Sequence, residues 1–277
     1  MSAESFHLSF EFFPPSTSRG LANLTEAAHR LNQFSPEFFS VTYGAGGSTK
    51  TRTSETVEEL ISRGFVTVPH LSWGDTTRDL VVEQIKKYQK SDVSGFVLLR
   101  GDTPSGTVAQ TVHHAVDLVN LVRSEFGNAF KIFVAAYPEM HPDAPNPSRD
   151  IEFLREKVDA GADACFTQYF YNSDAYFYFV EACRGNGIDV PIIPGIMPIT
   201  NCERLVRFSR NCGAEIPRWI ESKMFEYKDD QASLEDFGCD VVQSLCQRLV
   251  DNDCPGFHFY TLNRARATTR ILRSLDY

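Results

Sequence analysis

The feature that most constrains the fold of this chain is a regular alternation of short apolar runs with segments of helical periodicity. After the first run, apolar side chains recur at spacings of three and four, at Leu24, Ala27, Ala28 and Leu31, which is typical of an amphipathic helix. The apolar runs themselves have the length of strands. They predict eight strands, at residues 8–12, 38–43, 66–71, 95–99, 132–137, 165–169, 190–194 and 257–260.

Helical periodicity recurs between most of these strands, at residues 57–61, 108–119, 151–158, 205–212 and 234–245. Thr76 and Asp79 have the spacing of a capping box, which predicts a further helix start ahead of Leu80. Because no Pro-, Gly- or Ser-rich linker interrupts the series, residues 1–277 are interpreted as a single domain. An open doubly wound sheet is the alternative, but its G-x-G-x-x-G motif does not follow the first strand. The prediction is an α/β fold, a single (β/α)8 TIM barrel.

Length and charge fit an enzyme that acts on a small molecule. The chain has 277 residues, of which 42% are hydrophobic, and a barrel of this kind needs about 250. The formal net charge is −9, and the sequence has no basic run interleaved with aromatic residues. This composition argues against nucleic acid as the main partner.

Cysteine usage indicates a reducing compartment. The seven cysteines are an odd number and form no C-x-x-C motif, so neither a disulfide framework nor a metal site is expected. The N-terminal residues lack a signal-peptide pattern, and no window approaches ~18 consecutive apolar residues. We therefore expect a cytoplasmic protein without a membrane-bound segment.

The first predicted strand carries a carboxylate inside a run of aromatic residues, SFEFFPP at Ser9–Pro15. Side chains alternate along a strand, so Ser9, Glu11 and Phe13 are expected on one face. Burial of Glu11 among phenyl rings would raise the pKa of its carboxyl group and let it donate a proton near neutral pH. A strand-end glutamate that pairs with a lysine or arginine of the barrel is the alternative.

The barrel fold makes a prediction about where chemistry lies, because active sites in this fold form at the carboxyl ends of the strands. The predicted strand ends are rich in polar side chains. They carry Glu11, Thr42, Tyr43, His70, Arg100, Gly101, Asp102, Tyr137, His141, Gln168, Asn263 and Arg264. Turn chemistry alone accounts for the glycines, but not for Glu11, His70, Gln168 and Arg264 together.

Several of these positions have structural alternatives. The Gly-rich segment 44–48 either presents backbone N–H groups to a phosphate or is a flexible loop. His70 is either a site residue or a hydrogen-bonded core histidine. Arg100 and Asp102 either contact a polar ring edge or pair with each other. Aromatic residues, amide donors and the absence of metal-ligand spacing together favour a large planar redox cofactor such as a flavin.

Nine segments, in order along the whole chain, carry a resemblance to a known family. They are FEFFPP (10–15), VTYGAGG (41–47), PHL (69–71), LRGD (99–102), AAYPEMHP (135–142), DAGAD (159–163), TQYF (167–170), PGIMPITN (194–201) and FHFYTLNRA (257–265). With these segments the chain resembles the methylenetetrahydrofolate reductase family.

The resemblance implies a (β/α)8 enzyme that reduces 5,10-methylenetetrahydrofolate to 5-methyltetrahydrofolate, with FAD reloaded by NADH or NADPH. Glu11 matches the general acid that assists opening of the imidazolidine ring. Asp102 matches a residue that holds the pterin and influences the flavin, and is also assigned a catalytic role. Substrate-binding positions are matched by Asp102, Gln168 and Arg264, and nicotinamide contacts by Thr42 and Gln168.

The resemblance also implies which residues bind FAD. The matching positions are Tyr43, Ala45, His70, Arg100, Gly101, Asp102, Ala115, Tyr137, His141, Ala144, Asp150 and Lys157. Three positions depart from the family pattern. Phe153 and Glu156 stand where a polar and a basic residue are expected near FAD, and Arg204 stands where a substrate-contacting glutamine is expected.

Two other functions stay open at this point. A related flavin barrel of the proline dehydrogenase type would use the same architecture, and a folate-binding or partner subunit without catalysis is favoured by Phe153 and Glu156. The choice between NADH and NADPH and the formation of a homo-oligomer are open as well. A chain that ends at Tyr277 is expected to lack the S-adenosylmethionine-binding regulatory domain of the eukaryotic enzymes.

Overall fold

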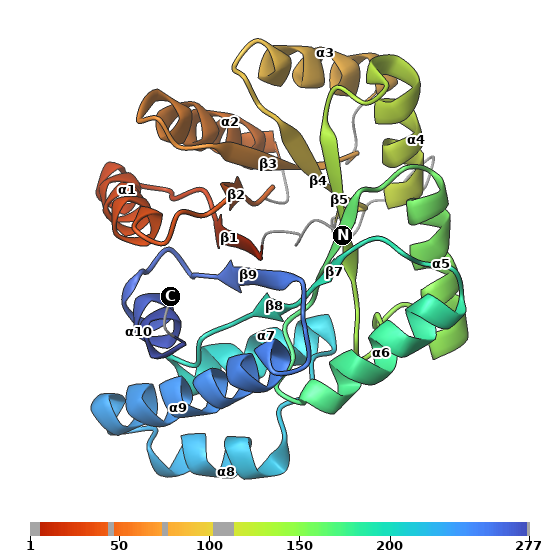
Figure 1. Cartoon of the computed structure of the whole chain (residues 1–277). Helices are drawn as coiled ribbons and strands as arrows, with labels where there is room; N and C mark the ends of the chain where they lie inside the picture. The colour runs from red at the N-terminus through yellow and green to blue at the C-terminus, as the bar shows by residue number, and fades with distance from the viewer. Residues whose placement is uncertain (1–5, 44–46, 74–76, 102–113, 276–277) are drawn as a thin grey trace.

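Parallel strands surrounded by helices form a barrel in the computed structural model, which describes residues 6–43, 47–73, 77–101 and 114–275 (Figure 1). The strands are β1 (His7–Phe12), β2 (Phe38–Val41), β3 (Thr67–Ser72), β4 (Gly95–Leu99), β5 (Lys131–Ala136), β6 (Ala164–Thr167), β7 (Ile192–Ile193), β8 (Gly195–Ile196) and β9 (Gly256–Tyr260). Their order in the sheet is β7-β6-β5-β4-β3-β2-β1-β9-β8. This arrangement confirms the predicted TIM-like barrel.

The seventh predicted strand, 190–194, differs from the structure because it is divided. β7 pairs with β6 and β8 pairs with β9, and only Pro194 lies between β7 and β8. Proline has no N–H for a ladder hydrogen bond, so a break at this residue is expected. Gly195 is required after the break, since an added Cβ would lie 2.1 Å from the carbonyl oxygen of Thr167. The two short strands together close the barrel.

Helices cover the outside of the barrel (Figure 1). They are α1 (Ser18–Asn32), α2 (Gly47–Ser62), α3 (Arg78–Gln89), α4 (Ala115–Phe126), α5 (Pro147–Asp159), α6 (Ser173–Gly185), α7 (Cys202–Cys212), α8 (Arg218–Glu226), α9 (Gln231–Val250) and α10 (Arg266–Ser274). Periodicity did not predict α6, α8 or α10. The predicted cap at Thr76 is corrected, because Thr77 is the residue whose side chain accepts a hydrogen bond from the N–H of Leu80.

The side chains of the strands alternate between two cores. Phe10, Phe12 and Phe39 point outward and are buried against the helices. A separate cluster fills the barrel interior, with side chains from β2 to β7, at Phe38, Val68, Val97, Phe133, Ala164, Phe166 and Ile193. The period of two along each strand produces this separation.

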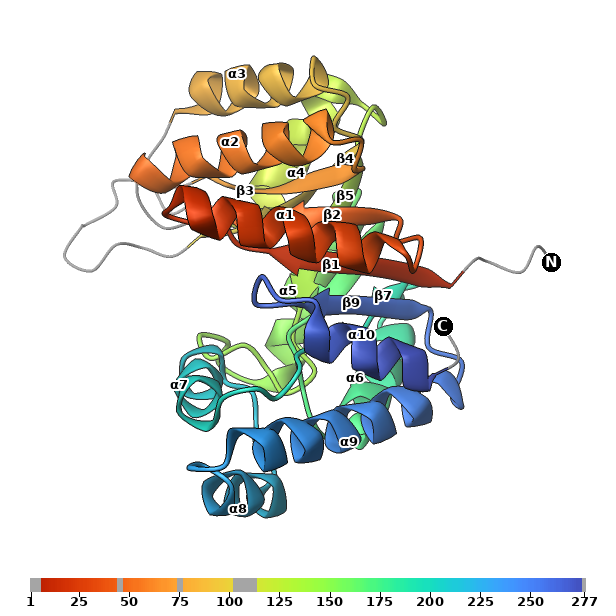
Figure 2. The same cartoon turned by 90° about the vertical axis from the view of Figure 1, so that its left-hand side faces the viewer.

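The interior next to β1 and β9 is polar, although most of the barrel interior is apolar. His7, Ser9 and His258 are all buried there, and Glu11 lies beside them on the same face of β1. Buried polar groups are tolerated when they are hydrogen-bonded to one another. Figure 2 shows α7 on the side of the barrel where the carboxyl ends of the strands lie. Within the described ranges, no helix is both long and apolar enough to cross a bilayer.

Candidate active site

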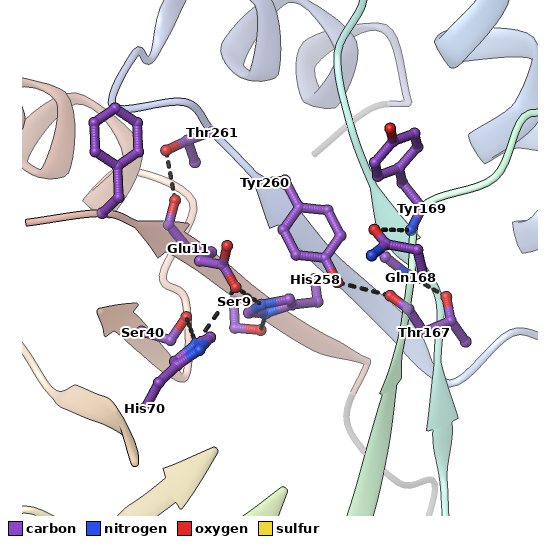
Figure 3. Close-up of polar contacts among 12 residues, drawn as sticks. Ser9, Glu11, Ser40, His70, Thr167, Gln168, Tyr169, His258, Tyr260 and Thr261 are labelled. Carbon is purple, nitrogen blue, oxygen red and sulfur yellow. Dashed lines mark hydrogen bonds and ion pairs between the residues drawn. The ribbon is translucent and has the colours of Figure 1, made fainter. Parts of the chain in front are cut away.

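Glu11 lies near the carboxyl end of β1 with its side chain in the barrel interior, 17% exposed. Burial raises the pKa of its carboxyl group, and the nearby His70 opposes that effect. The predicted direction of the shift is therefore found, but the expected cause is corrected. The phenyl rings of Phe10 and Phe12 point to the opposite face, and Phe13 is exposed. The carboxyl group is instead buried among imidazole and hydroxyl groups (Figure 3).

His70 on β3 is one of these neighbours. Its Nε2 lies 3.4 Å from Oε2 of Glu11 and 3.3 Å from Oγ of Ser40 on β2. Burial lowers the pKa of the imidazole from 6.5 to about 4, so the ring is neutral at physiological pH. Its Nδ1 is buried and finds no hydrogen-bond partner among the described residues. His70 is thus both a core histidine and a neighbour of the acid.

His258 on β9 is a site residue that the sequence reasoning missed. Its Nε2 faces Oε2 of Glu11 at 3.5 Å, and its Nδ1 is hydrogen-bonded to Oγ of Ser9 at 2.7 Å. The ring stacks on Phe166 with centroids 4.1 Å apart, which fixes its plane. Burial lowers the pKa of His258 well below its usual value. The alternation of Phe257 and Phe259 with His258 was the signal that could have placed this histidine inside the barrel.

Tyr260, two residues after His258, also points inward and was not predicted as a site residue. Its hydroxyl donates a hydrogen bond to the carbonyl oxygen of Thr167 at 2.7 Å. Burial and the neighbouring Glu11 raise the pKa of this phenol. Gln168 follows directly on β6, and its Oε1 accepts a hydrogen bond from the N–H of Tyr169 at 3.0 Å. Its amide nitrogen is left for another partner in this conformation (Figure 3).

The turn after β9 fixes the end of β1. Oγ1 of Thr261 donates to the carbonyl oxygen of Glu11 at 2.6 Å. The side chain of Asn263 accepts from the N–H of Phe13 at 2.9 Å and donates to its carbonyl oxygen at 2.8 Å. Leu262 and Asn263 have positive φ values of 52° and 57°, which is the conformation that brings Asn263 back onto β1. This one turn therefore holds the backbone at both Glu11 and Phe13.

The ends of β2 and β4 place further predicted residues at the same side of the barrel. Oγ1 of Thr53 on α2 donates to the carbonyl oxygen of Thr42 at 3.0 Å, and burial raises the pKa of Tyr43. Arg100 forms an ion pair with Asp143 at 2.6 Å. Its guanidinium therefore has an acidic partner other than Asp102, the partner that the sequence suggested as one alternative. Gly101 has a φ of +82° and an added Cβ would lie 2.9 Å from Ser72. Ala45 and Asp102 lie outside the described residues.

The β5–α5 connection is built around His141 and Asp150. The Asp150 carboxylate accepts the N–H of His141 at 2.9 Å, and Nδ1 of His141 accepts the N–H of Asp143 at 3.0 Å. Tyr137 packs edge-on against His141 with centroids 4.5 Å apart. Ala144 closes a turn onto the carbonyl oxygen of His141. These predicted FAD contacts thus lie next to one another. Ala115, a further predicted FAD contact, is the first residue of α4.

Lys157 does not extend freely toward this surface. Its Nζ donates to the carbonyl oxygen of Ala135 at 2.6 Å, and burial lowers the pKa of its ammonium group. Two N–H groups of an ammonium remain for another acceptor. The role of Lys157 in FAD binding stays a prediction, with the structural contact to β5 as a second role.

The departures at Phe153 and Glu156 lie on the exposed face of α5 next to Arg149. The guanidinium carbon of Arg149 lies 4.5 Å from the ring centroid of Phe153, and its Nη2 lies 3.9 Å from Oε1 of Glu156. Glu156 is 46% exposed. Arg155, which precedes Glu156 in the chain, lies 3.9 Å from Asp159. Arg149 is the basic residue that neighbours both departures.

A cavity of about 290 Å³ opens between the segments that follow β8 and β9. Arg204 on α7 and Arg264 after β9 both line it, and neither forms an ion pair within the described part of the chain. The carboxylate of Glu235 in the same cavity is paired with Arg266 at 3.4 Å. The cavity is therefore suited to a ligand that carries a carboxylate. It is lined by Met197, Pro198, Thr200, Asn201, Arg204, Leu205, Phe208, Gln231, Glu235, Leu262 and Arg264.

Two features of this structure fit a bound flavin. Nδ1 of His70 is a buried polar atom without a partner among the described residues, and a hydrogen bond from a ligand would satisfy it. The Tyr137–His141 surface and Arg100 lie beside one another at the neighbouring strand ends. Within the described ranges, no three His, Cys, Asp or Glu side chains lie close enough to hold a metal ion.

The fold and site define a class. The chain is a TIM-like barrel with a buried acid of raised pKa at the carboxyl ends of its strands and a cavity lined by Arg204 and Arg264. Sequence comparison is more specific. The family model described as Methylenetetrahydrofolate reductase matches residues 1–276. The chain belongs to the methylenetetrahydrofolate reductase family.

Individual relatives support this assignment, and two of them are of similar length. The chain is 38% identical over 268 residues to the 5,10-methylenetetrahydrofolate reductase of Buchnera aphidicola, covering 96% of this chain and 91% of that protein. It is 37% identical over 271 residues to the Escherichia coli enzyme of the same name, covering 97% and 90%. A probable methylenetetrahydrofolate reductase (NADH) of Oryza sativa is 36% identical, and this chain spans 48% of it.

Among solved structures, one match is an uncharacterized protein from Clostridium thermocellum, described as binding two copies of 5-methyl-5,6,7,8-tetrahydrofolic acid. The TM-score is 0.68 with 16% identity, over 98% of this chain and 94% of that one. A phosphonopyruvate hydrolase matches with a TM-score of 0.53 and 13% identity, over 98% and 81%. At these identities the matches show the barrel fold.

Proposed function

We propose that this chain reduces 5,10-methylenetetrahydrofolate to 5-methyltetrahydrofolate, with FAD as the bound cofactor and NADH or NADPH as the electron donor. The observation that carries the proposal is Glu11, a buried carboxyl group of raised pKa. It lies at the strand ends of a chain that is 38% identical to a named reductase over 96% of its length. Such a carboxyl group is suited to a reaction that needs a proton donor near neutral pH.

Glu11 supplies the proton for the folate half of the reaction. Its carboxyl O–H gives a proton to a nitrogen of the imidazolidine ring, the C–N bond of that ring breaks, and a 5-iminium cation forms on the folate. Hydride addition to the iminium carbon then gives the methyl group. A bound flavin supplies that hydride after it has been reduced by the nicotinamide. Because His70 and His258 are neutral, neither places a positive charge beside Glu11 that would favour the ionised carboxylate.

The residues proposed to hold FAD are those of the strand-end surface. They are Nδ1 of His70, the guanidinium of Arg100, which also pairs with Asp143, and the packed rings of Tyr137 and His141. Gly101 lets the backbone approach closely, since a larger residue at this φ would be strained and would meet Ser72. Thr42 and Gln168 are proposed to contact the nicotinamide and then the folate in turn.

Arg264 and Arg204 are proposed to bind the carboxylates of the folate tail. Both line the cavity between the β8 and β9 segments, and both are free of ion pairs within the described ranges. An arginine binds a carboxylate through two parallel hydrogen bonds, which fixes both position and orientation.

The test is an anaerobic absorbance experiment on the purified protein. We expect bound FAD to lose its visible absorbance on addition of NADH or NADPH and to regain it on addition of methylenetetrahydrofolate, with 5-methyltetrahydrofolate as the product. Reoxidation that fails with folate but occurs with a proline-derived imine would place the chain in the proline dehydrogenase type. A protein that binds folate but takes up no FAD would be a non-catalytic subunit.

A further inference from the structure

A continuous series of polar side chains runs through the barrel interior from its amino-terminal end to Glu11. We name it the polar column; its members are Glu37, His7, Ser9 and His258. Oε2 of Glu37 lies 3.0 Å from Nδ1 of His7, and Nε2 of His7 lies 2.7 Å from Oγ of Ser9. Ser9 lies 2.7 Å from Nδ1 of His258, whose Nε2 faces Glu11 at 3.5 Å. Figure 3 shows Ser9 and His258 together with Glu11.

The column follows from the strand pattern. His7, Ser9 and Glu11 alternate with outward phenyl rings on β1, and Ser9 is in register with His258 on β9. Both imidazole rings are held by aromatic neighbours, His258 by Phe166 at 4.1 Å and His7 by Phe38 at 5.5 Å between centroids. The planes of the two rings are therefore fixed, and each ring directs one of its nitrogens to one neighbour and the other nitrogen to the other neighbour. Glu37 lies just before β2, and its side chain is 44% exposed.

The direction of the hydrogen bonds along the column is set at its exposed end. The hydrogen bond with His7 lowers the pKa of Glu37, so Glu37 is ionised and can only accept. A neutral His7 therefore places its single N–H on Nδ1 and offers a lone pair at Nε2. Ser9 donates its only O–H to that lone pair. Ser9 must then accept from Nδ1–H of His258.

This direction decides what His258 presents to Glu11. Burial keeps His258 neutral, and a neutral imidazole has one N–H. That N–H lies on Nδ1 and is used by Ser9, so Nε2 carries a lone pair. A lone pair facing a carboxyl oxygen attracts an O–H and repels a carboxylate.

We propose that the polar column is a set of positioning residues that presents a lone pair to Glu11 and thereby holds its carboxyl group in the protonated form. The arrangement deepens the proposed role of Glu11 as a proton donor and rests on that role for its function. It gives the exposed Glu37, remote from the reacting atoms, control over the protonation state of the acid. Each member acts through its neighbour, and only Glu11 meets the substrate.

Other charged and titratable groups face the two ends of the column. Glu11 is also approached by His70 from β3, whose Nε2 lies 3.4 Å away, and by Tyr260 from β9. An N–H of His70 can donate to the hydroxyl oxygen of a protonated Glu11, so both histidines fit the same state. Glu37 is approached by Lys131 from β5, which favours its ionised form. A doubly protonated His7 would instead donate to Ser9, and the column would then run in the reverse direction.

The test measures the protonation of Glu11 directly, in the full-length FAD-loaded protein at rest. The infrared C=O band of a protonated carboxyl group is titrated with pH and assigned by subtracting the spectrum of Glu11→Gln. The readout needs no turnover, so its result stands whether or not the proposed folate activity is found. Glu37→Lys replaces an acceptor with a group that only donates, which reverses the column. Glu37→Gln is the matched control, because its amide oxygen can still accept from His7.

We expect Glu37→Lys to lower the midpoint of the Glu11 band by about one pH unit, tenfold in the protonation constant. Glu37→Gln should leave the midpoint within about 0.3 unit. Ser9→Ala should lower it too, since a broken column no longer fixes the proton of His258. The double variant Glu37→Lys, Ser9→Ala distinguishes an effect passed along the column from a direct effect of charge. The column predicts that Glu37→Lys has no further effect there.

Three results would overturn the proposal. The first is a Glu11 midpoint that is the same in wild type, Glu37→Lys and Ser9→Ala. The second is a shift for Glu37→Gln that is about half the shift for Glu37→Lys, which would show that charge alone acts, because the two changes raise the charge at this position by one and two units. The third is a full effect of Glu37→Lys without the Ser9 hydroxyl, which would show that the influence does not pass along the column. Circular dichroism and FAD content identify a variant that has failed to fold, and Glu37 is exposed enough to tolerate exchange.

Discussion

Replacing His70 by glutamine should remove a large part of the loss of stability that this protein suffers in mild acid. The pKa of His70 is lowered by burial from 6.5 to about 4. A group whose pKa is depressed in the folded state contributes stability that is present above its unfolded pKa and is lost as pH falls toward the folded pKa. The window for His70 therefore extends from 6.5 down to about 4. Within this window His70 binds a proton in the unfolded chain but not in the folded protein.

The size of the effect follows from the same two values. The full difference of 6.5 to about 4 corresponds to about 3 kcal/mol, and about 2 kcal/mol of it is lost between about pH 7 and about pH 5. Urea unfolding of wild type and His70→Gln at these two pH values measures it. We expect the stability of wild type to fall by about 2 kcal/mol more than that of His70→Gln.

A matched control is available in His29, an exposed histidine on α1. His29→Gln removes one imidazole without touching the barrel interior, so it controls for the loss of a histidine as such. An equal acid loss in wild type and His70→Gln would refute the account, because it would mean that His70 is protonated in the folded protein. Its contact with Glu11 would then be an ion pair, and the acid would be ionised.

Three further changes test other parts of the site. Burial raises the pKa of the Glu139 carboxyl group from 4.5 to about 7, so Glu139 contributes stability that is lost as pH rises through this range. In urea unfolding, Glu139→Gln should make the free energy of unfolding depend less on pH in this range. An unchanged pH dependence would contradict the burial of Glu139. Arg264→Gln should raise the KM for methylenetetrahydrofolate by about three- to tenfold and leave flavin reduction by NADH unchanged; damage to both would mean a structural role. Glu156→Arg should lower the dissociation constant of FAD at low salt, with a gain that shrinks as salt rises, because it replaces a negative charge beside Arg149 with a positive one; a dissociation constant that does not change would place this face of α5 away from the cofactor.

The sequence predicted the barrel because period-two and period-3.6 patterns are local properties of the chain. It also predicted that Glu11, His70, Arg100 and Gln168 lie at strand ends, since that follows from the direction of each strand. The division of the seventh strand at Pro194 was missed, although proline at a ladder position is a local signal. The helix start at Thr77 was misplaced by one residue, because either threonine can cap.

Contacts between distant segments could not be predicted in the same way. Glu11 and His258 are 247 positions apart, and their approach depends on the closure of β1 against β9. The pairing of Lys157 with the carbonyl of Ala135 depends on how α5 packs on the sheet. The cause of the raised pKa of Glu11 was misassigned for the same reason. Sequence alone places Phe10 and Phe12 beside Glu11 along the strand, whereas the fold places His70 and His258 beside it in space.

The most direct test of the central claim measures the two half-reactions of Glu11→Gln separately, under anaerobic conditions and by stopped flow. Glutamine keeps the shape of the side chain but has no carboxyl proton to give. We predict that reduction of FAD by NADH or NADPH proceeds at close to the rate of wild type. Reoxidation by methylenetetrahydrofolate should slow by roughly 10² or more, the usual scale for loss of a general acid. Equal slowing of both half-reactions, or reoxidation at the rate of wild type, would contradict the assignment of Glu11 as the proton donor.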